Sequence, residues 1–407
     1  MVERRGSRGA RRGAGERSEG RRGRAERFAG LVLSRARGLG GVGARTLRSA
    51  LGSYRAVVET SLAGGRGVVP GPLAEAIRAA YEGGAAGQDL VTAERAGARF
   101  AVPGSEDYPE ILHGIARPPI GLYVAGVPLE RLQPALAVVG TRAATRRGSA
   151  IARDLAFDAA SAGLTLVSGL ARGIDTAAHE GALEAGGTTV AVLGSGLSRI
   201  YPSENERLAR EIVRLGAIVS EYPMLQGPRA GSFPARNRII AGLSAGVVVV
   251  EAGHRSGALI TAARALEEGR EVFAVPGPVT EPLSRGPNGL IKAGAALVEG
   301  IEDVLNELRP AWGPLWEAQQ DAPAGGADVG DGRPAAESPE AGGAATGPSS
   351  RIRALLTEQP LSVDELCELT GLAAGVVTST LFELELAGQA TACPGARYAR
   401  AKARVLK

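Results

Sequence analysis

Four basic residues follow short apolar runs of the sequence and lie close to glycine or serine residues. They are Arg142, Arg172, Arg236 and Lys292. Glycine lets a backbone approach a ligand closely, and a guanidinium group can bind a phosphate through two parallel hydrogen bonds. An ion pair within the protein is a fair explanation for any one of the four. Four such residues at one edge of a sheet favour a phosphate site.

Neighbouring residues supply further groups that suit a nucleic-acid ligand. Ser168, Gly169, Ser256 and Gly257 offer hydroxyl and backbone N–H donors. Phe233 precedes a proline, and an exposed ring there would stack a base whatever its sequence, with core packing as the alternative. The full set of predicted ligand-binding residues is Gly140, Thr141, Arg142, Ser168, Gly169, Arg172, Phe233, Arg236, Asn237, Ser256, Gly257 and Lys292.

An enzyme is the main alternative to a binding protein. Asp175 and His179 are four residues apart at the start of a predicted helix and could form an acid/base pair. The simpler interpretation is that Asp175 complements the helix dipole and His179 packs locally. The sequence has no Gly-x-x-x-x-Gly-Lys-Ser/Thr string, and Gly194-Ser195-Gly196 alone is weak evidence for a dinucleotide. We therefore predict no catalytic residue and no cofactor, with a nucleotide-processing hydrolase as the alternative.

Six apolar runs separated by helix-like segments must position these residues. Each run is apolar throughout rather than alternating, which indicates strands buried on both faces. Intervening segments of about ten residues or more suit repeated strand, helix, strand units. The predicted fold is a doubly wound, mostly parallel α/β sheet that binds its ligand beyond the carboxyl ends of the strands. The predicted strands are Ala135–Val139, Leu164–Val167, Thr188–Leu193, Ala217–Val219, Gly246–Val250 and Glu271–Val275.

The composition is that of an ordinary globular protein, with 44% hydrophobic and 22% charged residues in a chain of 407. This length suits two or three domains. No apolar run reaches the roughly 18 residues that span a bilayer, so no membrane is expected as a partner. Cys367 and Cys393 form neither a disulfide framework nor a metal cluster, and only three histidines are present. We predict a cytoplasmic protein without a metal site.

Positive charge is concentrated at the N-terminus. Residues 1–27 contain ten arginines and four glutamates, so that the rest of the chain carries a net charge of −2 although the total is +4. This segment has no apolar core and is predicted to be a disordered tail. It could add phosphate binding without sequence preference, or be a solvated tail only. Any basic binding surface on the folded part must be local.

Residues 28–85 are predicted to form a small helical domain. Within it, Arg37 to Leu47 is similar to the hairpin of helix-hairpin-helix modules, in which backbone N–H groups face a DNA phosphate. A phosphate-binding hairpin and a purely structural turn are equally supported.

The remaining domains are separated by changes of composition. We expect the sheet domain at 100–310, a flexible linker at 311–350 and a winged-helix domain at 351–402. The third helix predicted for the winged-helix domain, Ala374 to Gly388, contains no Lys or Arg. Base reading in a major groove normally needs such residues, so protein contact or a structural role is favoured.

The strings that follow the apolar runs resemble the DNA-processing protein A (DprA/Smf) family of bacteria. The resemblance covers residues 105–305, and Gly286 to Ala295 fits the last loop of the family. The best matches are Gly-Thr-Arg at 140–142, Ser-Gly-Leu-Ala-Arg-Gly-Ile-Asp-Thr-Ala-Ala-His at 168–179, Phe-Pro-x-Arg-Asn-Arg-Ile-Ile-Ala-Gly-Leu-Ser at 233–244 and Ser-Gly-x-Leu-Ile-Thr-Ala at 256–262.

This resemblance implies a Rossmann-like sheet domain in a non-catalytic, homodimeric protein that binds single-stranded DNA. It also implies a partnership with the RecA recombinase, which the protein would help to load onto incoming DNA during DNA uptake and natural transformation. A helical N-terminal domain and a C-terminal winged helix are common in the family. A scaffold that dimerises through its sheet and recruits partners through its terminal domains, with incidental DNA binding, is a further alternative.

Overall fold

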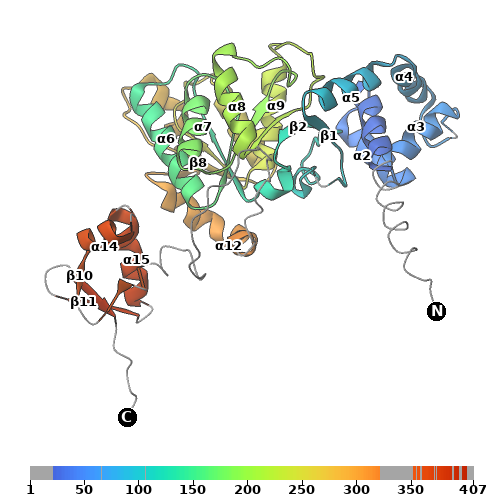
Figure 1. Ribbon diagram of the computed structural model, residues 1–407. Coiled ribbons are helices and arrows are strands. Elements are labelled where there is room, and N and C mark those ends of the chain that lie inside the picture. The colour runs from blue at the N-terminus through green and yellow to red at the C-terminus, as the bar shows by residue number, and fades with distance from the viewer. Residues whose placement is uncertain are drawn as a thin grey trace, which may run out of the picture. The chain divides into compact units, whose positions relative to one another are not determined.

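The computed structural model describes residues 22–320, except 66 and 106, and residues 352–400, with gaps at 354, 358–359, 371, 373, 387–388 and 394–396. The chain forms two compact units, Met1–Ala324 and Gly325–Lys407 (Figure 1), and each is described by itself. The predictions for residues 1–21 and 321–350 lie outside the described residues.

The first unit is built on a nine-stranded sheet in the order β1-β2-β6-β5-β4-β3-β7-β8-β9. From β6 to β9 in that order all neighbours are parallel, whereas β2 pairs antiparallel with both β1 and β6. The prediction of a doubly wound, mostly parallel sheet is confirmed, and all six predicted strands are present as β3 to β8. The strands are β1 Ala98–Ala101, β2 Leu122–Gly126, β3 Ala135–Val139, β4 Thr165–Ser168, β5 Thr189–Leu193, β6 Ala217–Ser220, β7 Gly246–Val249, β8 Glu271–Ala274 and β9 Ala296–Leu297.

Helices cover both faces of this sheet, as continuously apolar strands require. Leu136 and Val138 of β3 pack on one face with α6, α7 and α12, while Ala137 and Val139 pack on the other with α9 and α10. In Figure 1, α6, α7 and α8 lie side by side. The helices are α6 Arg146–Ser161, α7 Ile174–Glu184, α8 Glu206–Leu215, α9 Ser232–Leu243, α10 Gly257–Glu267, α11 Arg285–Lys292 and α12 Ile301–Gln320.

The N-terminal part of this unit is helical and packs around its own apolar cluster, which includes Leu31, Tyr54 and Ile77. Phe100 of β1 and Tyr123 of β2 belong to the same cluster, and their rings meet edge-on with centroids 4.8 Å apart. The antiparallel edge of the sheet therefore carries the helical part. Its helices are a first one over residues 22–35, then α2 Gly41–Leu51, α3 Tyr54–Leu62, α4 Gly71–Glu82 and α5 Ala85–Arg95.

Helices extend into three segments for which the sequence indicates none. Residues 22–27 of the predicted disordered tail are helical, because the Glu26 carboxylate accepts hydrogen bonds from the N–H groups of Tyr54 and Arg55. The helical region also continues past residue 85 with α5. α12 extends into the predicted linker as far as Gln320. In this part of the helix, Trp312 packs against the core of the sheet domain, and the centre of its ring lies 6.0 Å from the Arg270 guanidinium carbon.

The second unit is a winged helix, as predicted. Its sheet has the order β10-β12-β11 with antiparallel pairing, and the buried residues around it include Ile352, Leu366 and Val377. Its elements are β10 Leu361–Ser362, α14 Val363–Thr370, α15 Ala374–Leu386, β11 Ala390–Cys393 and β12 Arg397–Arg400.

Candidate functional site

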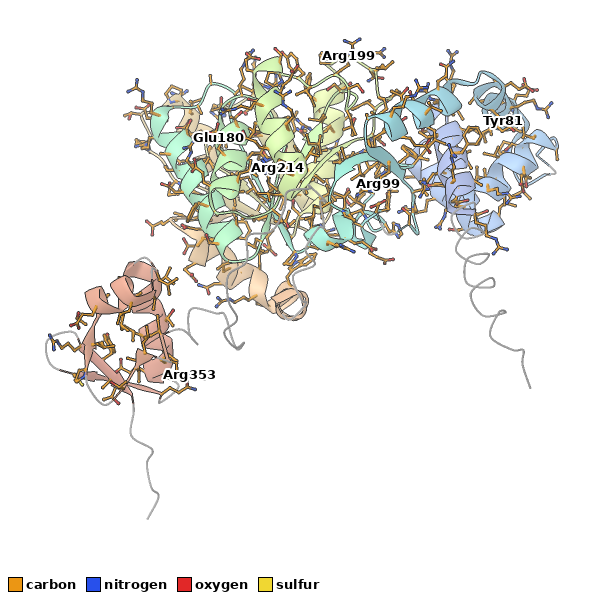
Figure 2. All side chains as sticks on the ribbon, in the orientation of Figure 1. Tyr81, Arg99, Glu180, Arg199, Arg214 and Arg353 are labelled. Atoms are coloured by element: carbon orange, nitrogen blue, oxygen red, sulfur yellow. The ribbon has the colours of Figure 1, made fainter. Side chains whose placement is uncertain are left out.

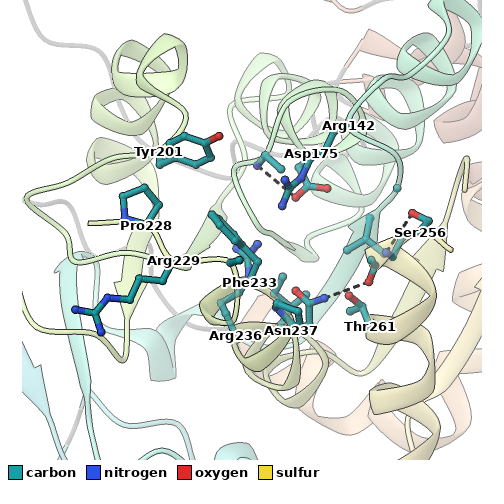
Figure 3. A pocket seen from close by; sticks show the side chains of 18 residues that line it. Arg142, Asp175, Tyr201, Pro228, Arg229, Phe233, Arg236, Asn237, Ser256 and Thr261 are labelled. Carbon is teal, nitrogen blue, oxygen red and sulfur yellow. Dashed lines mark hydrogen bonds between the residues drawn. The ribbon is translucent and has the colours of Figure 1, made fainter. Parts of the chain in front are cut away.

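A crevice of about 720 Å³ opens beyond the carboxyl ends of the parallel strands (Figure 3). It lies where the strand order reverses, because β4 pairs with one side of β3 and β7 with the other. Ligands of doubly wound sheets bind at such switch points. The segments after β3, β4, β5, β6 and β7 supply its lining: Val139, Gly140, Arg142, Ala171, Asp175, Tyr201, Pro228, Arg229, Ala230, Phe233, Pro234, Arg236, Asn237, Ile240, Ser256, Gly257, Ala258 and Thr261.

An arginine and two aromatic rings meet in this crevice. The Arg142 guanidinium carbon lies 4.9 Å from the centre of the Phe233 ring, and the rings of Phe233 and Tyr201 have centroids 5.7 Å apart. Figure 3 shows that the three side chains converge from three separate segments. Arg142 and Tyr201 are exposed and Phe233 is half-buried, so all three can touch a ligand. The attraction of a cation to a ring keeps the guanidinium beside a surface on which a base can stack.

Arg236 places a positive charge at the back of the crevice. Its side chain is 5% exposed, and its guanidinium donates hydrogen bonds to the main-chain oxygens of Gly169, over 2.8 Å, and Val192. A Cβ atom at position 169 would lie 2.5 Å from this guanidinium, so the close approach requires glycine there. Burial lowers the pKa of Arg236 to about 10, while the negative charge of Asp175 opposes this shift. Arg236 is therefore cationic at neutral pH.

Hydrogen bonds join the loops after β3, β4 and β7 into one rim. The N–H of Thr141 donates to the Glu251 main-chain oxygen over 2.7 Å, and the N–H of Ile174 donates to the Thr141 oxygen over 3.3 Å. The Glu251 carboxylate accepts hydrogen bonds from the N–H and the hydroxyl of Thr145, the N-cap of α6. This rim fixes the point from which Arg142 enters the crevice.

The N-terminus of α10 opens on the opposite side of the crevice. The Ser256 hydroxyl caps the helix by accepting a hydrogen bond from the N–H of Ala258, and the first turn contains no acidic residue. Backbone N–H groups and the helix dipole attract anions at such a terminus. The Asn237 amide donates to the Gly257 oxygen over 3.2 Å and so joins α9 to α10. Ser256 and Gly257 are placed to meet an anion, whereas Asn237 mainly positions them.

Five of the predicted ligand-binding residues are not among those that line the crevice: Thr141, Ser168, Gly169, Arg172 and Lys292. Thr141 and Gly169 act through their main chains, in the hydrogen bonds of the rim and of Arg236. Ser168 is fully buried, and its hydroxyl donates to the Val138 oxygen over 2.7 Å. Arg172 is exposed and forms an ion pair with Glu204, which is the alternative that the sequence left open. Lys292 is exposed in the last turn of α11.

Both residues of the candidate acid/base pair are buried, and only Asp175 lines the crevice. His179 is fully buried with Nδ1 2.7 Å from the Thr189 hydroxyl, and burial lowers its pKa to about 3. Asp175 lines the crevice, but its Oδ2 accepts hydrogen bonds from the N–H groups of Gly169 and Ala171. Burial raises the pKa of Asp175, and the charge of Arg236 opposes the shift. Both side chains are thus bound within the protein.

Three further lining residues were not singled out from the sequence. Tyr201 follows the third apolar run, and this position after a strand was the available signal. Arg229 lies in the loop before α9 and is exposed, with no strand end or motif beside it. Thr261 is 2% exposed on the second turn of α10.

Within the described ranges, no group of three or more His, Cys, Asp or Glu side chains is placed to hold a metal ion. Among the described helices, none combines the length and the apolarity that crossing a bilayer takes. Cys367 and Cys393 are both half-buried free thiols.

The sequence of the sheet domain matches the family model of DNA recombination-mediator protein A over residues 99–309, a range that includes the whole crevice. The model of the DprA winged helix domain matches residues 334–396. The chain belongs to the DNA recombination-mediator protein A family, also called DprA or Smf. The resemblance noted in the sequence is thereby confirmed.

Relatives and a solved structure match between about half and three quarters of this chain. Protein Smf of Escherichia coli (strain K12) is 43% identical over 292 residues, which span 72% of this chain and 74% of the relative. The DNA processing protein DprA of Streptococcus pneumoniae is 48% identical over 202 residues, 49% of this chain and 71% of the relative. The X-ray structure of DprA from Streptococcus pneumoniae superposes with a TM-score of 0.61 at 34% identity, and the match covers 70% of this chain and 97% of that one.

Proposed function

We propose that the crevice binds single-stranded DNA, with Arg142 on a phosphate and Phe233 stacked on a base. The observation that carries this proposal is the position of the Arg142 guanidinium 4.9 Å from the Phe233 ring, with both groups accessible in one crevice. A phosphate and its neighbouring base are the two parts of a nucleotide that such a pair can hold together.

The charges that line the crevice support a phosphate ligand. The described lining contains three arginines, Arg142, Arg229 and Arg236, but only one acidic residue, Asp175. Within the described ranges, neither Arg142 nor Arg229 has a carboxylate in ion-pair contact, so both guanidinium groups are available. The N-terminus of α10 adds backbone donors on the opposite wall.

The aromatic pair favours a single strand over a duplex. Stacking on Phe233 requires an unstacked base, which a single strand offers without the cost of opening a helix. Stacking and phosphate contact are both insensitive to base identity, so we expect little sequence preference.

The same proposal gives the protein a non-catalytic role in recombination. Its basis is family membership and the complete burial of His179 away from the described lining, which leaves no acid/base pair in the crevice. In this role the protein acts as a homodimer and helps to load the RecA recombinase onto the bound strand during DNA uptake and natural transformation. Purified RecA tests this step: the lag of its assembly on a single strand should shorten with the protein and stay unchanged with Arg142→Ala.

Fluorescence anisotropy of a labelled oligonucleotide of about 20 nucleotides tests the proposed ligand. The chain should begin at residue 22, because Glu26 holds the start of α3 and a cut at 27 would remove it. We expect Arg142→Ala to weaken binding of every sequence and to lower the slope of log affinity against log salt by about 0.7. The matched control is Arg214→Ala. Arg214 is an exposed residue of α8 (Figure 2) and does not line the crevice. Equal affinity for duplex and single strand, or an unchanged slope in Arg142→Ala, contradicts the proposal.

A further inference from the structure

A second cavity, of about 750 Å³, lies where the N-terminal helices meet the sheet domain. It is formed by the hairpin before α2, the segment before β2, the loop after β6 and one side chain of α9. Its lining is Ser34, Arg35, Leu39, Gly40, Gly41, Val42, Arg117, Pro118, Ile120, Gly121, Glu221, Tyr222, Pro223, Gln226 and Arg238. None of these residues belongs to the crevice described above.

The arginines of this cavity differ in their partners. Arg35 forms an ion pair with Asp89, and Arg238 donates to both carboxylate oxygens of Glu221 over 2.6 Å. Arg117 is exposed, and the described part of the chain offers it no ion pair or hydrogen bond. Glu221 is the one acidic residue of the described lining and pairs with Arg238, and Arg35 pairs with Asp89. The excess positive charge of this wall is therefore that of Arg117.

The two cavities are connected along the outer side of α9. Pro234 lines the crevice, and Arg238, one helical turn further on, lines the second cavity, about 6 Å away along the helix axis. A hollow of about 100 Å³ shares Pro234 with the crevice and both Arg117 and Arg238 with the second cavity. Of the acidic residues of this hollow, Glu267 pairs with Arg264, whereas Glu268 accepts a hydrogen bond from the N–H of Ala116 and keeps its negative charge. Arg117, Arg238 and Arg264 outnumber these two carboxylates in the described lining, so the hollow remains basic.

The glycine hairpin contributes to the far wall of the second cavity. A Cβ atom at Gly41 would lie 1.6 Å from the Pro118 oxygen, so this glycine serves the packing of the hairpin on the sheet domain. Gly40 has nothing within 4 Å of such an atom and faces open space. No side chain caps α2, and its first turn has no acidic residue. These features agree with the charge of Arg117 but are secondary to it.

We propose that a DNA strand leaving the crevice passes over Pro234 and Arg238 and places a phosphate on Arg117 in the second cavity. The strand then runs from the sheet domain onto the N-terminal helical part, and the footprint on one protomer exceeds the crevice. This inference rests on the proposed function, because the crevice must hold the strand first. Charge complementarity and the continuity of the two cavities carry it.

Oligonucleotides of two lengths test the path. One of about 5 nucleotides fits the crevice alone, and one of about 15 reaches Arg117. We expect Arg117→Glu to weaken binding of the longer one by about fivefold and to leave the shorter one unchanged. Arg117→Lys keeps the charge and should bind the longer oligonucleotide as tightly as the unchanged chain does. Arg214→Glu, on α8, is the control for a charge reversal elsewhere on the surface. Because Arg117 is exposed, far-UV circular dichroism of Arg117→Glu should equal that of the unchanged chain.

Each outcome decides between the two proposals. Selective loss with the longer oligonucleotide supports the path. If Arg117→Glu binds both lengths as the unchanged chain does, or weakens both equally, the path is wrong while the crevice keeps its ligand. If neither length binds the unchanged chain, the proposed function fails and the path with it. Equal losses in Arg117→Glu and Arg214→Glu mean that only general charge matters, and this too overturns the path.

Discussion

At the scale of single residues, the three arginines and lysine that the sequence placed at one site have different surroundings. Arg142 reaches into the crevice beside Phe233, and Arg236 is buried on main-chain oxygens behind it. Arg172 pairs with Glu204, and Lys292 is exposed on α11. Only Arg142 combines accessibility with an aromatic neighbour, so it has the strongest basis for contact with a phosphate.

In the proposed function, the contribution of Phe233 is stacking rather than charge. We expect Phe233→Leu to weaken single-strand binding by about 1 to 3 kcal/mol, because the leucine fills the space but offers no flat π surface. The salt slope should stay unchanged, unlike that of Arg142→Ala, since no charge is lost. Anisotropy titrations at two salt concentrations measure both quantities, with Phe233→Tyr as the control that keeps the ring. Unchanged affinity in Phe233→Leu would assign the ring to packing alone.

His179 makes stability depend on pH. Its pKa is about 3 in the folded chain and about 6.5 when unfolded, so between these values the unfolded chain binds the additional proton. The free energy of unfolding therefore falls as pH decreases below the unfolded value, by about 2 kcal/mol between pH 7 and pH 5.

Urea unfolding of the unchanged chain and of His179→Gln at both pH values isolates this contribution. Burial raises the pKa of Asp175, so its contribution to the pH dependence has the opposite sign, but it is common to both chains. The difference in unfolding free energy between the two chains should shrink toward lower pH. A constant difference would show that His179 does not titrate in this range.

At the scale of elements, the crevice depends on how closely the loops approach one another. Gly173, the N-cap of α7, has φ 77° and ψ −123°, a conformation that side chains rarely adopt. A Cβ atom there would also lie 2.4 Å from the Thr141 oxygen, within the rim that positions Arg142. This glycine therefore couples the start of α7 to the loop after β3.

Gly186 provides a matched comparison at the other end of α7. It has φ 67°, but a Cβ atom there would meet nothing within 4 Å. We expect Gly186→Ala to lower the unfolding free energy by about 1 kcal/mol through backbone strain alone, and Gly173→Ala to cost at least about 2 kcal/mol more because the rim must move. Chemical denaturation measures both. Equal costs would mean that the contact with Thr141 is easily relieved.

The elements differ in how well the sequence predicts them. The six strands β3 to β8 are recognisable because burial on both faces makes them apolar throughout. β9 has only two residues, and α5 begins directly after a glycine pair, so neither has a clear local signal. At the site, position after a strand identified Gly140, Arg142 and Ser256. The direction in which Ser168 or Arg172 points depends on tertiary partners, Val138 and Glu204, that the sequence does not place.

At the scale of the whole molecule, the winged helix is a separate compact unit whose longest helix, α15, contains no Lys or Arg. We expect a chain ending at residue 324 to bind single-stranded DNA as tightly as the full chain, because the crevice and the second cavity lie entirely in the first unit. Anisotropy with both chains measures this, with residues 325–407 alone as the control. A large loss of affinity in the shortened chain would assign DNA contacts to the winged helix.

The pairing of β3 with β7 has a consequence for the order of events during synthesis. This pair joins Leu136 to Gly246 in the middle of the sheet, and the walls of the crevice come from residues on both sides of that contact. A nascent chain that has left the ribosome only as far as β6 lacks two thirds of the lining residues, because these come from residues 228–261. If the crevice binds DNA as proposed, we expect a partly made chain to have little affinity for it and binding to begin only when the sheet domain is nearly complete.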